Sequence, residues 1–272
     1  MIEDIILSHD KRGVSTLKHD VPPQFCERAS RFLYDNADRV IIVTGFYVQD
    51  HCETDGPVGA LMLAQALESL GSDVQLVTDR YCFEVFTTMN ISFPVHEFPI
   101  TGITCSEKIT EHILSSVDPS VIVSIERCGR AHDGNYYNMK GIDISRYTAQ
   151  IDSLFTFPKT VGIGDGGNEI GMGNVWDSVK RKIPCGEIIA STVKTTHLVL
   201  SSVSNWGAYG MITYLSRIAG EDLLVPEEPI LARVVKAGAI DSYSKRPVLQ
   251  VDGYGEEVTH SIISQLHDEL FL

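Results

Sequence analysis

Short, almost entirely apolar runs alternate with longer amphipathic stretches over the first half of this chain. The alternating segments are RVIIVTGF (39–46), GPVGALMLAQALESLG (56–71), DVQLVTD (73–79), SEKITEHILSSV (106–117) and VIVSIE (121–126). Apolar runs of about four to eight residues are typical of strands whose two faces are both covered by helices. The pattern therefore predicts βαβ units and an α/β fold, with a largely parallel or mixed sheet flanked by helices.

The second half of the chain repeats this alternation less regularly. The expected strands are TVGIGDGG (160–167) and HLVLSSV (197–203), and the expected helices lie near 207–219, 227–237 and 255–270. No internal repeat or low-complexity linker interrupts the pattern. We therefore predict a single domain over residues 1–272, and leave open a small subdivision near residue 150.

The predicted helix 56–71 has defined ends. Thr54 or Asp55 can cap its start, Pro57 suits its first turn, and Gly71 ends it. The loop before it follows a predicted strand, and open α/β sheets bind ligands at the carboxyl ends of their strands. We therefore expect the functional site at that edge of the sheet.

Charge and cysteine usage exclude several classes of protein. A formal net charge of -14 repels phosphate backbones, so no nucleic-acid partner is expected. The six cysteines form no C-x-x-C pair, which argues against a zinc ribbon. No apolar run approaches the roughly 20 residues of a membrane span, and the first residues lack the order of a signal peptide. We expect a cytoplasmic protein without a membrane partner, and a two-fold homodimer as the default assembly.

The stretch VGIGDGGNEIGMG (161–173) formally matches the dinucleotide-binding pattern G-x-G-x-x-G. That pattern needs an uninterrupted strand before it and a helix after it, so that pyrophosphate lies at the helix N-terminus. Here Pro158 and Lys159 interrupt the approach, and the carboxylate of Asp165 would repel pyrophosphate. We therefore predict no nucleotide cofactor.

The same acid suits a cation. Asp165 and Glu169 are four residues apart, so they would share one face if the chain became helical at Gly167. The stretch is then interpreted as a loop that binds one metal ion or one substrate ammonium group.

Further acids stand in loops that follow predicted strands. Asp-Gly pairs begin at Asp55, Asp133, Asp165 and Asp252. Taken alone, such a pair is ordinary turn chemistry, and for Asp252 the turn is the simpler interpretation. However, Glu53 shares a loop with Asp55, and Glu126 and His132 precede Asp133. Carboxylates beside glycines are ligands for hard cations such as Mg²⁺, Mn²⁺ or Ca²⁺, although a lone histidine is more often a hydrogen-bonded surface or core residue.

Four motifs together resemble a known family. These are ETDGPVGA (53–60), SIERCGRAHDGNYYNMKGIDIS (124–145), GIGDGGNEIGMG (162–173) and SVSNWGAYG (202–210), and they look like the D-glutamate cyclase-like domain. The resemblance covers nearly the whole chain. It implies a hydro-lyase that converts D-glutamate, a small acidic amino acid, to 5-oxo-D-proline and water. In the animal enzyme, the resembling part is C-terminal and a different domain precedes it.

Such a reaction needs a neutral α-amine and an electrophilic γ-carboxyl group. A divalent cation could withdraw charge from the γ-carboxylate, and an uncoordinated acid or a histidine could move the protons. The predicted metal ligands are Asp55, Glu126, Asp133, Asp165 and Glu169, and the predicted catalytic residues are Glu126, His132 and Asp165.

The substrate also needs groups that hold its α-carboxylate. Arg127 or Arg130 could bind it in a bidentate manner, or could instead neutralise the nearby acids. The predicted substrate-binding residues are Thr44, Arg127, Arg130, Gly166, Gly167, Asn205 and Gly207. For Asn205, simple capping of the following helix is an equal alternative.

Two other functions fit the same acids. Aspartates at strand ends also serve metal-dependent phosphohydrolases, and Arg127, Arg130 and His132 keep that alternative open. A third alternative is a non-catalytic protein that binds an amino acid or a metal ion.

Overall fold

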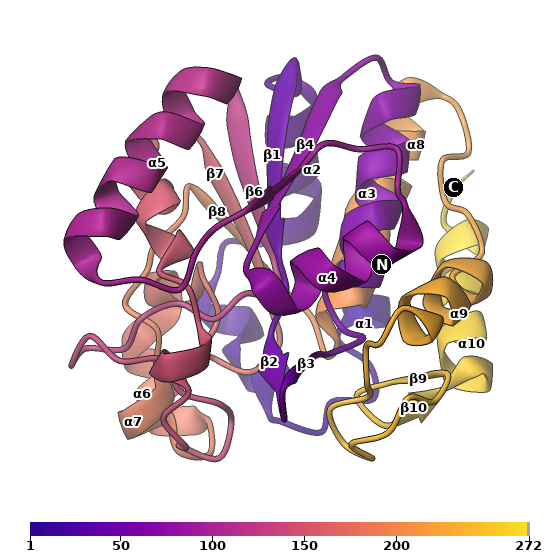
Figure 1. Ribbon diagram of the computed structural model, residues 1–272. Coiled ribbons are helices and arrows are strands. Elements are labelled where there is room, and N and C mark those ends of the chain that lie inside the picture. Colours follow the sequence, from indigo (N-terminus) through magenta and orange to yellow (C-terminus); the bar gives the residue numbers. More distant parts are fainter. Residues whose placement is uncertain (271–272) are drawn as a thin grey trace.

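A computed structural model describes residues 1–270 of the chain. Its centre is a sheet of six strands, all parallel, in the order β5-β4-β1-β6-β7-β8 (Figure 1). The sheet strands are β1 (Arg39–Thr44), β4 (Asp73–Thr78), β5 (Val95–Glu97), β6 (Val121–Ile125), β7 (Thr160–Gly164) and β8 (His197–Leu200). The predicted α/β class with helices on the sheet is confirmed.

The remaining elements connect or cover these strands. Two small hairpins are formed by β2 (Tyr47–Val48) with β3 (His51–Cys52) and by β9 (Gln250–Val251) with β10 (Tyr254–Gly255). The α-helices are α1 (Ile2–Ile6), α2 (Phe25–Tyr34), α3 (Pro57–Ser69), α4 (Arg80–Met89), α5 (Ile103–Val117), α6 (Trp176–Lys182), α7 (Gly186–Ile189), α8 (Ser204–Ala219), α9 (Glu228–Lys236) and α10 (Glu256–Asp268). The 3₁₀ helices are η1 (Val14–Asp20), η2 (Ser145–Tyr147), η3 (Ile151–Thr156) and η4 (Met172–Val175).

The strand order contains a switch point between β1 and β6. From β1 the chain continues to β4 and β5 on one side, and it then returns to add β6, β7 and β8 on the other side. The loops that leave β1 and β6 therefore diverge at the carboxyl ends of these strands, which is where open α/β sheets commonly bind their ligands. Both small hairpins lie at this same end of the sheet, at the bottom of Figure 1.

The strands are apolar on both faces because each face has its own core. In β1, Val40 and Ile42 point into the core that α2, α3 and α8 share, whereas Ile41 and Val43 point into the core under α5 and η3. In Figure 1, α5 covers one face, and α3 and α8 cover the opposite face. The uninterrupted apolar run of β1 follows from this double coverage.

The predicted strand 39–46 ends earlier, at Thr44. Gly45 has a φ of 102°, and an added Cβ would lie 2.7 Å from both the Cβ of Cys82 and the Oγ1 of Thr78. The chain turns here in a conformation that favours glycine. Strands from both sides of residue 150 belong to one sheet. Among residues 1–270, no helix is both long enough and apolar enough to cross a membrane.

Glu227, at the start of α9, yields a prediction about stability. Burial raises its pKa to about 7, although the hydroxyls of Tyr209 and Thr259 oppose this rise. Because the folded protein binds this proton more tightly than an ordinary carboxyl of pKa 4.5 does, its contribution to stability is complete below about pH 4.5. That contribution is lost as the pH rises through about 7.

Glu227→Gln should therefore raise the free energy of unfolding at pH 8 by roughly 2–3 kcal/mol, and change it little at pH 4.5. Urea unfolding at both pH values measures the difference. An equal change in the free energy of unfolding at the two pH values would show that the ionisation of Glu227 does not destabilise the folded state.

Candidate active site

Six buried carboxylates gather at the carboxyl ends of the central strands. Glu126 directly follows β6, Asp165 directly follows β7, and the others come from neighbouring loops and the β9–β10 turn. The set comprises Glu53, Asp55, Glu126, Asp165, Glu169 and Asp252, each at most 4% exposed. We call these six residues the acid cluster.

The acid cluster contains two overlapping groups of three acids. In one, Glu126, Asp165 and Glu169 each offer an oxygen within 4.8 Å of the others. In the other, Asp55, Asp165 and Asp252 do the same. Asp165 belongs to both groups and is therefore the centre of the arrangement.

Asp55 and Asn205 hold the N-termini of α3 and α8 together. The backbone N–H groups of Ser204 and Asn205 donate to the Asp55 carboxylate over 2.9 and 2.8 Å. In return, the side-chain oxygen of Asn205 accepts 2.8 Å hydrogen bonds from the N–H groups of Gly56 and Gly59. The prediction that Thr54 or Asp55 caps its own helix was wrong, because Asn205 of α8 accepts hydrogen bonds from the start of α3, and Asp55 accepts them from the start of α8.

Glu169 reaches Asp165 through a folded loop. The chain does not become helical at Gly167, which instead has a φ of 109°. Its N–H donates to Oε2 of Glu169 over 2.7 Å. A Cβ on Gly164 would lie 2.9 Å from the same oxygen. The glycines therefore let the loop fold back onto β7, which brings the two acids together without a helix.

Glu126 has an unusual backbone. Its φ of 46° lies in the left-handed region, which non-glycine residues rarely adopt. Its Oε2 accepts a 2.6 Å hydrogen bond from the hydroxyl of Ser204, and the backbone of Gly56 approaches its Cβ closely. Strained residues that the surrounding structure holds in place concentrate at functional sites.

Burial dominates the electrostatics of the acid cluster, and the crowding of negative charge adds to it. Burial, and then the neighbouring carboxylates, raise the pKa of Glu53 and Glu126 well above the ordinary value. Burial also raises the pKa of Asp165 well above its ordinary value, and that of Asp55 to about 7, even though hydrogen bonds from Asn205 and Ser204 lower the latter. The cluster thus holds more carboxylates than its surroundings can stabilise as anions.

Arg12, which the sequence analysis did not single out, is inserted into the acid cluster. Its Nη1 contacts the carboxylates of Asp165 and Asp252, the latter at 2.6 Å. Burial would raise the pKa of Asp252, but Arg12 and Ser242 lower it below the ordinary value. No pattern in the sequence links Arg12 to these acids, which lie more than 150 residues away. Asp252 does form the predicted turn, between β9 and β10, with a φ of 53°.

The structure does not bring His132 and Asp133 into the acid cluster. Both are exposed. The carboxylate of Asp133 instead accepts hydrogen bonds from the hydroxyl of Tyr137 and the backbone N–H of Asn135. The contact with Tyr137 lowers the pKa of Asp133. The loop after Glu126 therefore leads these two residues away from the other predicted ligands.

Arg127 is buried, and its partners lie outside the acid cluster. Its Nη1 pairs with Asp79 over 2.6 Å and donates to the carbonyl of Gly45, and its Nη2 donates to the carbonyl of Ala149. Only 1% of its side chain is exposed. This geometry favours a structural role for Arg127, which links β1, β4 and η3.

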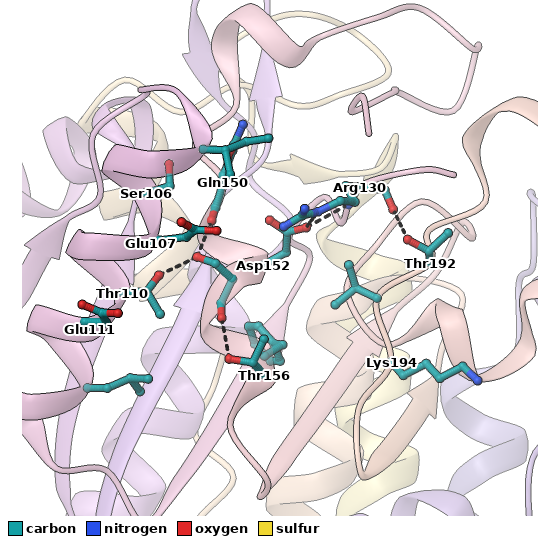
Figure 2. Close-up of a pocket in the computed structure, with 15 residues that line it drawn as sticks. Ser106, Glu107, Thr110, Glu111, Arg130, Gln150, Asp152, Thr156, Thr192 and Lys194 are labelled. Carbon is teal, nitrogen blue, oxygen red and sulfur yellow. Dashed lines mark hydrogen bonds and ion pairs between the residues drawn. The ribbon is translucent and has the colours of Figure 1, made fainter. Parts of the chain in front are cut away.

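Arg130 lies away from both Arg127 and the acid cluster. Its Nε pairs with Asp152 over 2.8 Å at one side of a cavity of about 770 Å³ between α5, η3 and the segment 192–194 (Figure 2). No acid of the cluster is among the residues that line this cavity. The structure therefore separates Arg130 from the acids that it was predicted to assist.

The other predicted substrate-binding residues lie close to the acid cluster or support it. Thr44 ends β1, and its Oγ1 has no hydrogen-bond partner among the described residues. Gly166 belongs to the loop of Glu169, where a Cβ would lie 2.9 Å from Oε1 of that acid. A Cβ on Gly207 would lie 2.5 Å from Ile163, so Gly207 lets α8 pack against β7.

Arg127→Met should destabilise the protein by about 3–5 kcal/mol, because it leaves Asp79 buried without its counter-ion. Arg31→Met is a matched control, since the Arg31–Glu27 pair on α2 is exposed and should contribute less than about 1 kcal/mol. Denaturant unfolding of both variants measures the difference. If both variants lose a similarly small amount of stability, the structural role of Arg127 is contradicted.

Comparisons with known proteins agree with the resemblance in the motifs. The family model described as D-glutamate cyclase-like, C-terminal, matches residues 2–267. Human mitochondrial D-glutamate cyclase is 32% identical over 201 residues, which are 65% of this chain and 32% of that protein. The chain thus matches about a third of the length of that relative.

The chain is also similar to a solved structure, an exopolyphosphatase-related protein from Bacteroides fragilis. The sequence identity is 12%, the TM-score is 0.45, and the match covers 92% of this chain and 57% of the other. A likeness this distant supports no inference about function. The match over residues 2–267 is decisive, and the chain belongs to the D-glutamate cyclase-like family.

Proposed function

We propose that this protein is a lyase that converts D-glutamate to 5-oxo-D-proline and water, assisted by a divalent cation. Family membership and the similarity to human D-glutamate cyclase support the reaction. The location of the site rests on the group Glu126, Asp165 and Glu169 at the carboxyl ends of β6 and β7, next to the switch point of the sheet. We also propose that this domain is sufficient for the reaction by itself.

Between heavy atoms, the reaction forms one bond and breaks one. The α-nitrogen bonds to the γ-carboxyl carbon, and one carbon–oxygen bond of that carboxyl group breaks. Two protons leave the substrate ammonium and depart with the oxygen as water. A catalyst must therefore make the carboxyl carbon electrophilic and move protons from nitrogen to oxygen.

The donor set fits a hard cation. The carboxylates of Asp165 and Glu169, beside Glu126 in this group, act only as acceptors when they are ionised, and carboxylate oxygens are the ligands that such cations prefer. Oδ1 of Asp165 and Oε1 of Glu169 are enclosed and have no hydrogen-bond partner among residues 1–270. Buried polar atoms are normally satisfied, so these two oxygens support a ligand at this position. Bound there, a divalent cation would withdraw charge from the substrate γ-carboxylate.

Glu126 is our candidate for the proton transfer. The hydroxyl of Ser204 holds its Oε2, while its Oε1 has no protein partner among the described residues and is not fully enclosed. A carboxylate whose proton affinity is raised by burial is a competent base for an ammonium group near neutral pH. The geometry does not support the predicted His132 in this role, because that side chain lies outside the acid cluster.

The activity is tested directly by incubating the purified chain, supplemented with Mg²⁺, Mn²⁺ or Ca²⁺, with D-glutamate and separately with L-glutamate. We expect 5-oxoproline to form from the D isomer. Chromatography measures its formation against an enzyme-free control. Equal rates from both isomers would contradict the proposed specificity. If metal is bound and neither isomer yields product, this domain is not a cyclase by itself.

Cation binding is tested with a matched pair of variants. Asp165→Asn should lower the affinity for Mn²⁺ at least about tenfold, because it removes a charged ligand that both groups of acids share. Asp133→Asn should leave the affinity unchanged, because Asp133 lies on the exposed loop. Titration calorimetry measures both. If the Asp133 variant loses the cation and the Asp165 variant keeps it, the proposed site is wrong.

A further inference from the structure

Arg12 has a geometry that suits a ligand as well as a counter-ion. Within the described chain, it is the only basic side chain that forms an ion pair with the acid cluster. Only its Nη1 takes part in these contacts. Its Nε and Nη2 have no hydrogen-bond partner among residues 1–270, and they are not among the fully enclosed polar atoms.

These two nitrogens form one edge of the guanidinium plane. Two N–H groups on this edge point in parallel and match the two oxygens of a carboxylate. The same edge binds a carboxylate elsewhere in the chain, where Nε and Nη2 of Arg31 both donate to one oxygen, Oε1, of Glu27. Arg12 thus presents an unused carboxylate-binding edge beside the acids.

The segment around Arg12 is held firmly in place. The carboxylate of Asp10 accepts hydrogen bonds from the backbone N–H groups of Arg12, Gly13 and Ser15. The Nζ of Lys11 donates to the carbonyl of Asp252 over 2.9 Å and lies 3.4 Å from the centre of the Tyr254 ring. The guanidinium is therefore fixed between the N-terminal segment and the β9–β10 turn, and it does not need to be ordered by the ligand.

An acidic substrate needs such a group. The acid cluster repels a molecule that carries two carboxylates, and only one of them can be neutralised by the cation that activates it. The two arginines predicted for this task are engaged with Asp79 and Asp152. We propose, on the basis of the cyclase function above, that Arg12 binds the α-carboxylate of the substrate through Nε and Nη2, and so selects an α-amino dicarboxylate.

The test compares two ligands that differ only in this carboxylate. 4-Aminobutanoate has the amine and the reacting carboxyl group of glutamate, but it lacks the α-carboxylate. With Mn²⁺ present, the wild-type protein should bind D-glutamate more tightly than 4-aminobutanoate by about 10- to 100-fold, the effect of one or two charged hydrogen bonds. Arg12→Gln should abolish this preference, as measured by titration calorimetry.

Two further variants separate binding from folding. Arg12→Lys keeps a positive charge beside Asp165 and Asp252 but loses the paired donors, so it should fold and still lose most of the preference. Arg31→Gln, on the surface of α2, should change neither affinity. Mn²⁺ affinity should not fall in either Arg12 variant, because Arg12 competes with the cation for negative charge.

The outcomes are distinct. If Arg12→Lys and Arg12→Gln retain the preference for D-glutamate, Arg12 is not its ligand. If both lose Mn²⁺ and both ligands together, Arg12 is only a structural counter-ion. D-Glutamate binding by the wild-type protein without formation of 5-oxoproline would overturn the cyclase function while leaving the role of Arg12 in place. Absence of D-glutamate binding would overturn both.

Discussion

The central constraint on this structure is the negative charge of six carboxylates buried at one edge of the sheet. Transfer of a carboxylate from water into a protein is strongly unfavourable unless positive charge or hydrogen-bond donors offset it. Three kinds of compensation are present. Arg12 pairs with Asp165 and Asp252, the N-terminus of α8 donates two N–H groups to Asp55, and burial raises the proton affinity of several other acids. The first two compensations tie distant parts of the chain to this edge.

The topology of the sheet explains why the charge collects there. All six strands are parallel, so their carboxyl ends meet at one edge, and the connections diverge between β1 and β6. Glycines then allow close approach at two positions that matter. The backbone of Gly56 lies against Glu126, and the loop after Gly164 folds back so that Glu169 faces Asp165. In both places a side chain would occupy the space that the carboxylates or their loops now use.

The comparison between prediction and structure separates local from long-range information. Strong apolar runs and helix ends were sufficient to place β1, α3, β4, β6 and α8 nearly correctly, because both depend on neighbouring residues. The acids at strand ends were also predictable, since the residue after a parallel strand must lie at the shared edge. Arg127 and Arg130 were expected at the substrate, but they follow Glu126 into a loop that turns away, and each pairs with an acid from another segment. His132 and Asp133 continue along that loop to the surface.

The sequence by itself determined the α/β class, the family and the edge of the sheet that carries Glu126 and Asp165, because these depend on periodicity and on motifs of consecutive residues. Only the tertiary structure decided which acids lie together and which groups pair with them. Arg12 precedes its partners by more than 150 residues, and Asp55 and Asn205 cap each other's helices across a similar distance. Such pairings depend on how segments far apart in the sequence pack against the sheet, and a linear pattern carries no record of that packing.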